Sequence, residues 1–130
     1  MNTVPVNGKF QTPSGWIHKA DGFVRLHQDG LGGGNPHDYY EIPLKDLTKL
    51  MKSGVLFLHE VKYKKNDEDL ALQGHDYIEF YHKGDTPEVF ITINDSDRQM
   101  VGKWSDCRDI CAGKIDHVKL YWNLNPPVRP

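Results

Sequence analysis

Alternation of apolar with polar residues is the clearest pattern along the chain, and it predicts several β-strands. It is strongest at 88–94, where Val89, Ile91 and Ile93 share one side, and at 115–122. A period of two residues is typical of a strand with one buried side. Turn signals at 21–22 and 84–87 predict two antiparallel hairpins. Further strand candidates are 16–18, 23–27, 39–42, 55–64 and 75–83.

Helical spacing replaces this alternation in two segments. Residues 44–51 place leucine or methionine on one side, after Pro43, which suits a first helical turn, and before Gly54, which suits a helix end. In the second segment, Ser96 and Gln99 match a capping box, and an apolar stripe follows as far as Cys111. We therefore predict amphipathic helices over 43–53 and 97–112.

The order of these elements predicts an α+β domain with a mostly antiparallel sheet of five to six strands, in the order β-β-β-α-β-β-β-α-β. Each helix has one apolar stripe, so we expect both helices to pack on the same face of the sheet. The single domain spans 16–123. An extended N-terminal arm at 1–15 and a proline-rich tail at 124–130 flank it, and a glycine-rich loop at 29–38 interrupts it.

Charge and composition narrow the classes of partner. The 130-residue chain has a formal net charge of -2, so binding to nucleic acid or to an anionic membrane would need a local basic patch. No window reaches the roughly 18 apolar residues of a membrane-spanning helix. The only cysteines, Cys107 and Cys111, are spaced for one helical side and fit a disulfide loop poorly. We expect reduced thiols, a cytoplasmic location and no membrane association.

The sheet face opposite the two helices is the candidate binding surface. Residues that alternate with the predicted core place aromatic and lysine side chains on it. Exposed aromatic residues are anchors in protein interfaces, and aromatic residues mixed with cations also suit single-stranded nucleic acid. A further interpretation is that other segments of the chain, or a second copy of it, cover this face of the sheet. The predicted partner-binding residues are Tyr77, Tyr81, Phe90, Lys119, Tyr121 and Lys62.

Histidines and cysteines are the remaining candidates for chemistry. The chain has seven histidines but neither of the ligand spacings HExxH and HxH. A metal site or small enzyme built on His59, His82 and His117 is one alternative, and a single-stranded nucleic-acid binder is another. Both cysteines lie on the apolar stripe of the second helix, so we expect them to be buried. We predict a non-enzymatic protein, without metal or cofactor, that binds a protein partner or a copy of itself.

Overall fold

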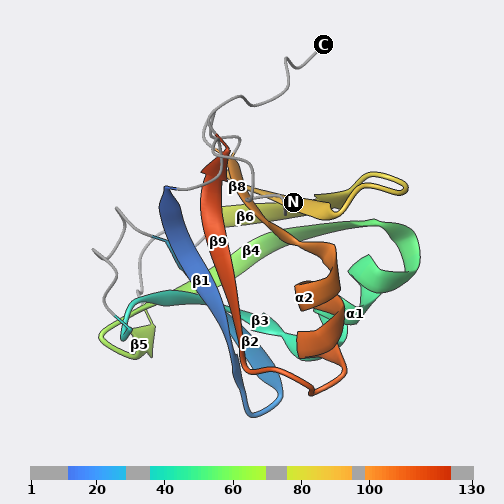
Figure 1. The fold of residues 1–130 in the computed structure, drawn as a ribbon. Coiled ribbons are helices and arrows are strands. Elements are labelled where there is room, and N and C mark those ends of the chain that lie inside the picture. The colour runs from blue at the N-terminus through green and yellow to red at the C-terminus, as the bar shows by residue number, and fades with distance from the viewer. Residues whose placement is uncertain (1–11, 29–35, 70–75, 95–98, 124–130) are drawn as a thin grey trace.

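The computed structural model describes residues 12–28, 36–69, 76–94 and 99–123, which form nine strands and two helices (Figure 1). Most of the glycine-rich loop, most of the N-terminal arm and the C-terminal tail lie outside the described residues. The elements in chain order are β1 (Pro13–Ala20), β2 (Phe23–Gln28), β3 (Tyr39–Pro43), α1 (Leu44–Ser53), β4 (Val55–Lys65), β5 (Glu68–Asp69), β6 (Asp76–His82), β7 (Glu88–Ile93), β8 (Gln99–Lys103), α2 (Trp104–Cys111) and β9 (His117–Asn123).

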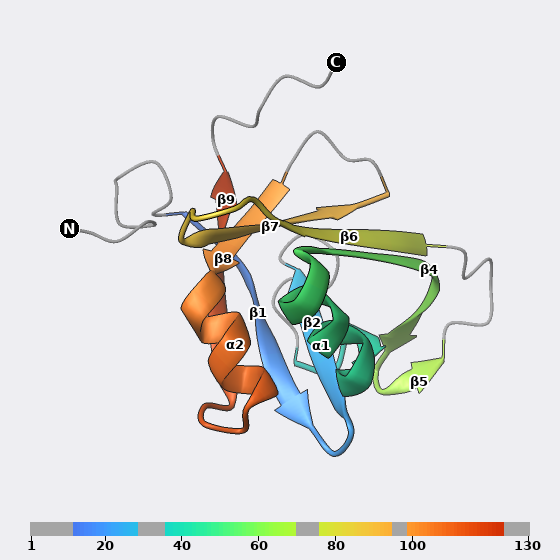
Figure 2. The same ribbon diagram turned by 90° about the vertical axis from the view of Figure 1, so that its right-hand side faces the viewer.

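The strands form one antiparallel sheet in the order β3-β2-β1-β9-β8-β7-β6-β4-β5. An additional pairing of β3 with β4 joins the two sides of this order, so the sheet curls into a nearly closed barrel (Figures 1 and 2). The predicted open sheet of five to six strands with helices on one face is therefore wrong. Alternation identifies the buried side of each strand, but it does not identify the neighbours that close a sheet.

Closure of the barrel depends on the long strand β4. Its first half pairs with β6 through Val55 to Leu58, and its second half pairs with β3 through Lys62 to Lys64. The register shifts between Leu58 and Val61. Such an irregularity bends a strand and increases its twist. One strand can therefore leave the β6 edge and reach β3, which completes the barrel wall.

The first helix begins after Pro43 and ends at Gly54, whose left-handed backbone (φ 79°) stops it and lets its N–H bond the Leu50 carbonyl at 2.8 Å. The second helix is shorter than the predicted range 97–112, because Gln99–Lys103 is strand β8. In β8, a Cβ on Gly102 would lie 2.8 Å from the Leu120 side chain. Glycine therefore permits the close packing of β8 against β9.

None of the helices in the described ranges has the length and apolarity needed to cross a bilayer.

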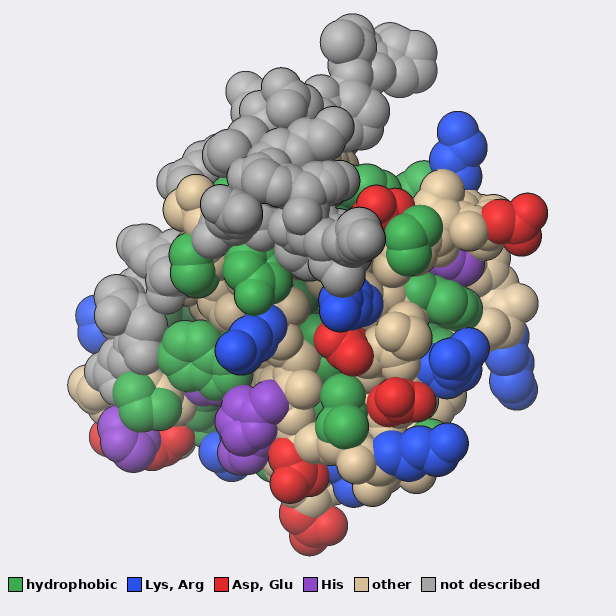
Figure 3. Space-filling model, in the orientation of Figure 1, with side chains coloured by type: hydrophobic (Ala, Val, Ile, Leu, Met, Phe, Trp, Pro, Cys, Tyr) green, Lys and Arg blue, Asp and Glu red, His purple; other side chains and the backbone are tan. Residues whose placement is uncertain are grey.

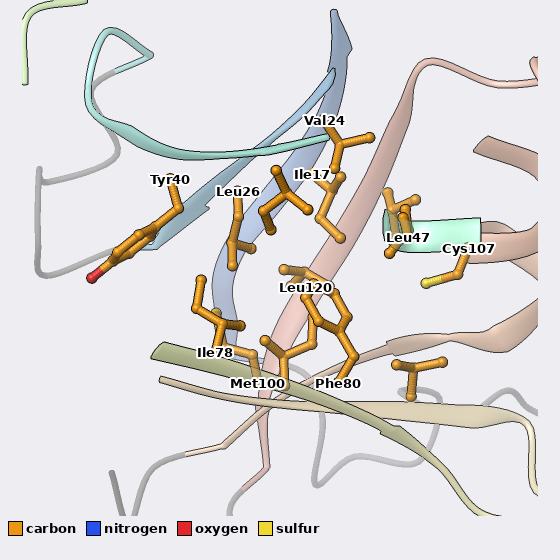
Figure 4. Packing of buried hydrophobic residues seen from close by; sticks show 14 of the residues in the cluster. Ile17, Val24, Leu26, Tyr40, Leu47, Ile78, Phe80, Met100, Cys107 and Leu120 are labelled. Carbon is orange, nitrogen blue, oxygen red and sulfur yellow. The ribbon is translucent and has the colours of Figure 1, made fainter. Parts of the chain in front are cut away.

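The core fills the inside of the barrel. Inward residues from opposite walls, such as Ile17, Phe80 and Leu120, are completely buried and point toward one another (Figure 4). The two helices lie side by side against the barrel (Figure 2), and Leu47 and Cys107 join the same core. Because the interior is packed with apolar side chains, polar chemistry and binding have to be sought on the outer surface.

Candidate functional site: the outer surface of the barrel

Five of the six predicted partner-binding residues lie on the outer side of strands β6, β7 and β9, with β8 between the last two. Tyr77 and Tyr81 project from β6, Phe90 from β7, and Lys119 and Tyr121 from β9, each alternating with buried residues. None of the four aromatic residues is buried. Lys62, the sixth, lies on the second half of β4, opposite Glu41 of β3, and the preceding residue Val61 pairs with Asp76 at the start of β6.

A continuous line of mainly apolar residues crosses this part of the surface. Direct register partners link it from strand to strand, with each member opposite the next. Val101 in its centre is fully buried beneath Phe90 and Tyr121, which pack against it. We call this line the apolar row; its members are Val55, Tyr81, Phe90, Val101, Tyr121 and Pro13.

The β4 end of the apolar row is exposed. Val55, Phe57 and Tyr81 are 43%, 47% and 43% exposed. The ring of Phe57 lies 5.5 Å from that of Tyr77 and 4.6 Å from that of His59. We call Val55, Phe57, Tyr77 and Tyr81 the aromatic patch. Sequence reasoning missed Val55 and Phe57, because residues 55–58 are all apolar and so no alternation marks which of them face outward.

Polar side chains border the apolar row. Thr92 and Asn123 are buried although they face outward, and Gln99 lies between them. The Asn123 Nδ2 donates to Gln99 Oε1 at 3.2 Å, and the Gln99 Nε2 lies 3.4 Å from Thr92 Oγ1. These contacts satisfy polar atoms that packing has removed from water. The apolar row therefore has a defined boundary on this side.

The second feature is a hollow of about 840 Å³ on the outer side of β9, β1 and β2, bordered by residues 36–37 and by Asp67. Four of the seven histidines line it, although sequence reasoning placed none of its candidate metal ligands there except His117. In Figure 3, histidine, cationic and hydrophobic side chains lie next to one another on the side formed by β1 and β9. We call it the histidine hollow; its main lining residues are Trp16, His18, Arg25, His27, His37 and His117.

The barrel strands bring these histidines together from distant parts of the chain. His18 and His117 are register partners on β1 and β9, and their ring centres are 4.6 Å apart. His27 stacks on its own register partner Trp16, with ring centres 4.3 Å apart and planes 11° apart. Its Nδ1 donates to the carbonyl of Asp38 at 3.1 Å, since a carbonyl oxygen only accepts. Pairing therefore fixes the positions of both stacked rings.

Positive charge predominates in the histidine hollow. The Arg25 guanidinium lies 4.6 Å from the centre of the Tyr39 ring, in cation–π geometry. Asp67 bonds His37 at 2.7 Å, and this bond is the main cause that lowers the pKa of the Asp67 carboxyl. Burial, followed by the positive charges of His117 and Arg25, lowers the pKa of His18 from its usual 6.5. The hollow therefore disfavours an additional cation and favours an anion.

The arrangement does not support the proposed histidine metal set. His59 lies against Phe57, His82 stacks on Trp104 at 3.7 Å, and His117 lies beside His18. In the parts of the chain that the structure describes, no group of three or more His, Cys, Asp or Glu is placed to hold a metal ion.

Both cysteine thiols are shielded from reaction. Cys107 is completely buried, and this burial raises the pKa of its thiol to about 12. Burial also raises the pKa of the partly buried Cys111. A thiol reacts as its thiolate, so neither residue has the low pKa of a catalytic cysteine.

The functional interpretation rests on this geometry alone. Comparison of the chain with protein-family models, with curated proteins and with solved structures gives no match.

Proposed function

We propose that this protein is a non-enzymatic binding protein that recognises a protein partner through the aromatic patch on β4 and β6. The observation that carries the proposal is the exposure of Val55, Phe57 and Tyr81, each more than two-fifths exposed. Val55 lies opposite Tyr81, and Phe57 follows two residues later on the same strand, opposite Glu79. Large apolar side chains grouped on a surface mark interaction sites, and aromatic residues dominate the binding energy of protein interfaces.

The shape of this surface favours a partner with a concave apolar groove. The outer surface of a barrel is convex, so two copies placed back to back would touch over a narrow strip. A stable interface buries about 800 Å² on each partner. A groove in a different protein can enclose Phe57 and Tyr81 and also follow the apolar row toward Phe90. We therefore favour a different protein over a second copy.

The state of the cysteines supports a reducing compartment such as the cytoplasm. Cys107 and Cys111 are free thiols on one side of α2, and Cys107 belongs to the core. Disulfides form and persist mainly in oxidising compartments. A partner of this protein would then be a cytoplasmic protein.

Site-specific photo-crosslinking tests the proposal directly. Benzoylphenylalanine is introduced at Phe57, and in a matched protein at Phe23, an exposed aromatic residue (37%) beside the β1–β2 turn. We expect irradiation in the native source to join position 57, but not position 23, to one other protein. The same adducts at both positions would contradict the proposed role of the patch. If the only adduct has twice the mass of the chain, the patch joins two copies of this protein instead.

A further inference from the structure

The histidine hollow has the size of a site for a small molecule. Its volume of about 840 Å³ lies within the range of roughly 300–1,000 Å³ that is usual for ligand sites. Three paired strands form its floor, while Pro36 and His37 border it from the segment before β3. It is distinct from the aromatic patch, because none of the patch residues lines it.

Arg25 is the strongest reason to expect an anion there. Its Nε is buried and has no hydrogen-bond acceptor among the described residues. A ligand in the hollow would therefore meet the rest of the guanidinium, which lines the hollow and can donate to a carboxylate or phosphate oxygen. The stack of its guanidinium on Tyr39 holds the group in place before any ligand arrives.

Neighbouring side chains reinforce this preference. Lys119 and the His18–His117 pair also line the hollow, on the β9 side. Asp67 is the one carboxylate among the described lining residues, and it is already bonded to His37. An anion would therefore meet several cationic or protonatable groups and a single, already occupied, acidic group.

Aromatic side chains also line the hollow. Trp16 lies in the stack with His27, and Tyr121 borders the hollow from β9. Aromatic pairs prefer offset or edge-to-face contact, so a planar ring has suitable partners here.

We propose that the histidine hollow binds a small planar aromatic anion, that is, an aromatic ring carrying a carboxylate or a phosphate group. Arg25 binds the acidic group, Lys119 adds positive charge, His117 can donate a hydrogen bond, and Trp16 contacts the ring. This inference is independent of the protein interface proposed above, since it rests on different residues. A nucleic-acid strand is a poorer fit, because the hollow is local and the chain has a net charge of -2.

Calorimetric titration of the full chain separates the two ligand sources from each other and from simple apolar binding. The probes are indoleacetate and adenosine monophosphate, each with its neutral counterpart, tryptophol and adenosine. We expect at least one anion to bind at least about tenfold more tightly than its neutral counterpart. No binding of either anion at millimolar concentration, or equal affinity for the neutral counterparts, would overturn the proposal.

Variants assign the effect to the hollow. Arg25→Gln should weaken binding of the anion about tenfold or more. The exposed changes Lys119→Gln and His117→Gln test the neighbouring charge and the neighbouring hydrogen-bond donor without disturbing the core. Lys83→Gln, on the exposed β6–β7 turn, is the matched control and should bind like wild type. Wild-type affinity in all three hollow variants would overturn the proposal. So would an oligothymidylate that binds more than about a hundredfold more tightly than the mononucleotide, since this would indicate a nucleic-acid site.

Discussion

The aromatic patch and the histidine hollow are two parts of the same barrel wall, built from the same alternation, yet they present opposite chemistry. Outward positions on β4 and β6 carry Val55, Phe57 and Tyr81, which are exposed and uncharged. Outward positions on β1 and β2 carry histidine, tryptophan and arginine around a hollow. Burial by a large partner removes an exposed apolar surface from water, and this favours binding. A cationic hollow, in contrast, needs only a small anion to fill it.

The two regions also depend on the backbone to different degrees. The patch needs only neighbouring strands in register, and β4 pairs with β6 through Val55 and Tyr81. The hollow needs β1 between β2 and β9, because His18 meets His117 only across that pairing. We therefore expect backbone changes in β1 to affect the hollow more strongly than the patch.

Gly15→Ala should have the largest effect. A Cβ at Gly15 would lie 1.9 Å from the backbone oxygen of His27, and this glycine has a φ of 154°. The strands β1 and β2 would have to separate beside the Trp16–His27 stack. We expect a loss of about 2–4 kcal/mol in the free energy of unfolding, measured by urea denaturation. Lys19→Ala in the same strand is the control, and a loss no larger than that of the control would contradict the close approach.

Phe57→Ser combined with Tyr81→Ser should separate binding from folding. Both side chains are exposed, so we expect the free energy of unfolding to change by less than about 1 kcal/mol. Loss of two aromatic anchors should weaken the affinity for the crosslinked partner about 30-fold or more, measured by titration with the purified partner. Phe23→Ser is the matched control. Equal weakening by the control would show that exposed aromatic character, rather than this patch, governs binding.

Acid should destabilise the hollow through His18. The folded state lowers the pKa of His18 below 6.5, so the unfolded state binds more protons between these two values. The stability contributed by neutral His18 is therefore present above pH 6.5 and is lost as the pH falls toward the folded pKa. We expect the free energy of unfolding to decrease as the pH is lowered through this window, in urea denaturation at a series of pH values.

The same titration identifies the groups responsible. His18→Gln should reduce the slope of the free energy of unfolding against pH. His117→Gln should reduce this slope in part, because burial and the charges of His117 and Arg25 lower the pKa of His18. Asp116 raises it. An unchanged slope in His18→Gln would show that other groups cause the loss in acid.

Lys62→Ala should have the smallest effect. The sequence placed Lys62 with the partner-binding residues, but the structure puts it opposite Glu41, outside the patch and outside the hollow. We expect partner affinity and anion affinity to remain within about twofold of wild type, because a single exposed charge outside both sites is screened by salt and contributes little. A larger loss in partner titrations would extend the interface along β4 toward β3.

The sequence was informative wherever the pattern was local. The Asp21-Gly22 turn, the helix between Pro43 and Gly54, and the outward direction of Tyr81 were all predictable, because each depends on residues close together in the chain. The strand Gln99–Lys103 was not, since its helical spacing is overruled by pairing with β7 and β9 on both sides.

Closure of the barrel and the histidine hollow were beyond local patterns. Alternation at 16–18 and 23–27 already separates Ile17 and Leu26 from His18 and His27, but it does not show that this hairpin lies beside β9. The meeting of His18 with His117 follows only from that pairing. The bond between His37 and Asp67 joins residues 30 apart in the sequence, so it too follows from the fold rather than from a local pattern.

The most direct test of two separate binding regions is one pair of affinities measured on four proteins. Partner affinity and aromatic-anion affinity are determined for wild type, for Phe57→Ser with Tyr81→Ser, for Arg25→Gln, and for all three changes together. We predict that the patch variant loses only the partner, that Arg25→Gln loses only the anion, and that the combined variant loses both. Loss of both ligands in either of the first two variants would contradict the separation of the aromatic patch from the histidine hollow.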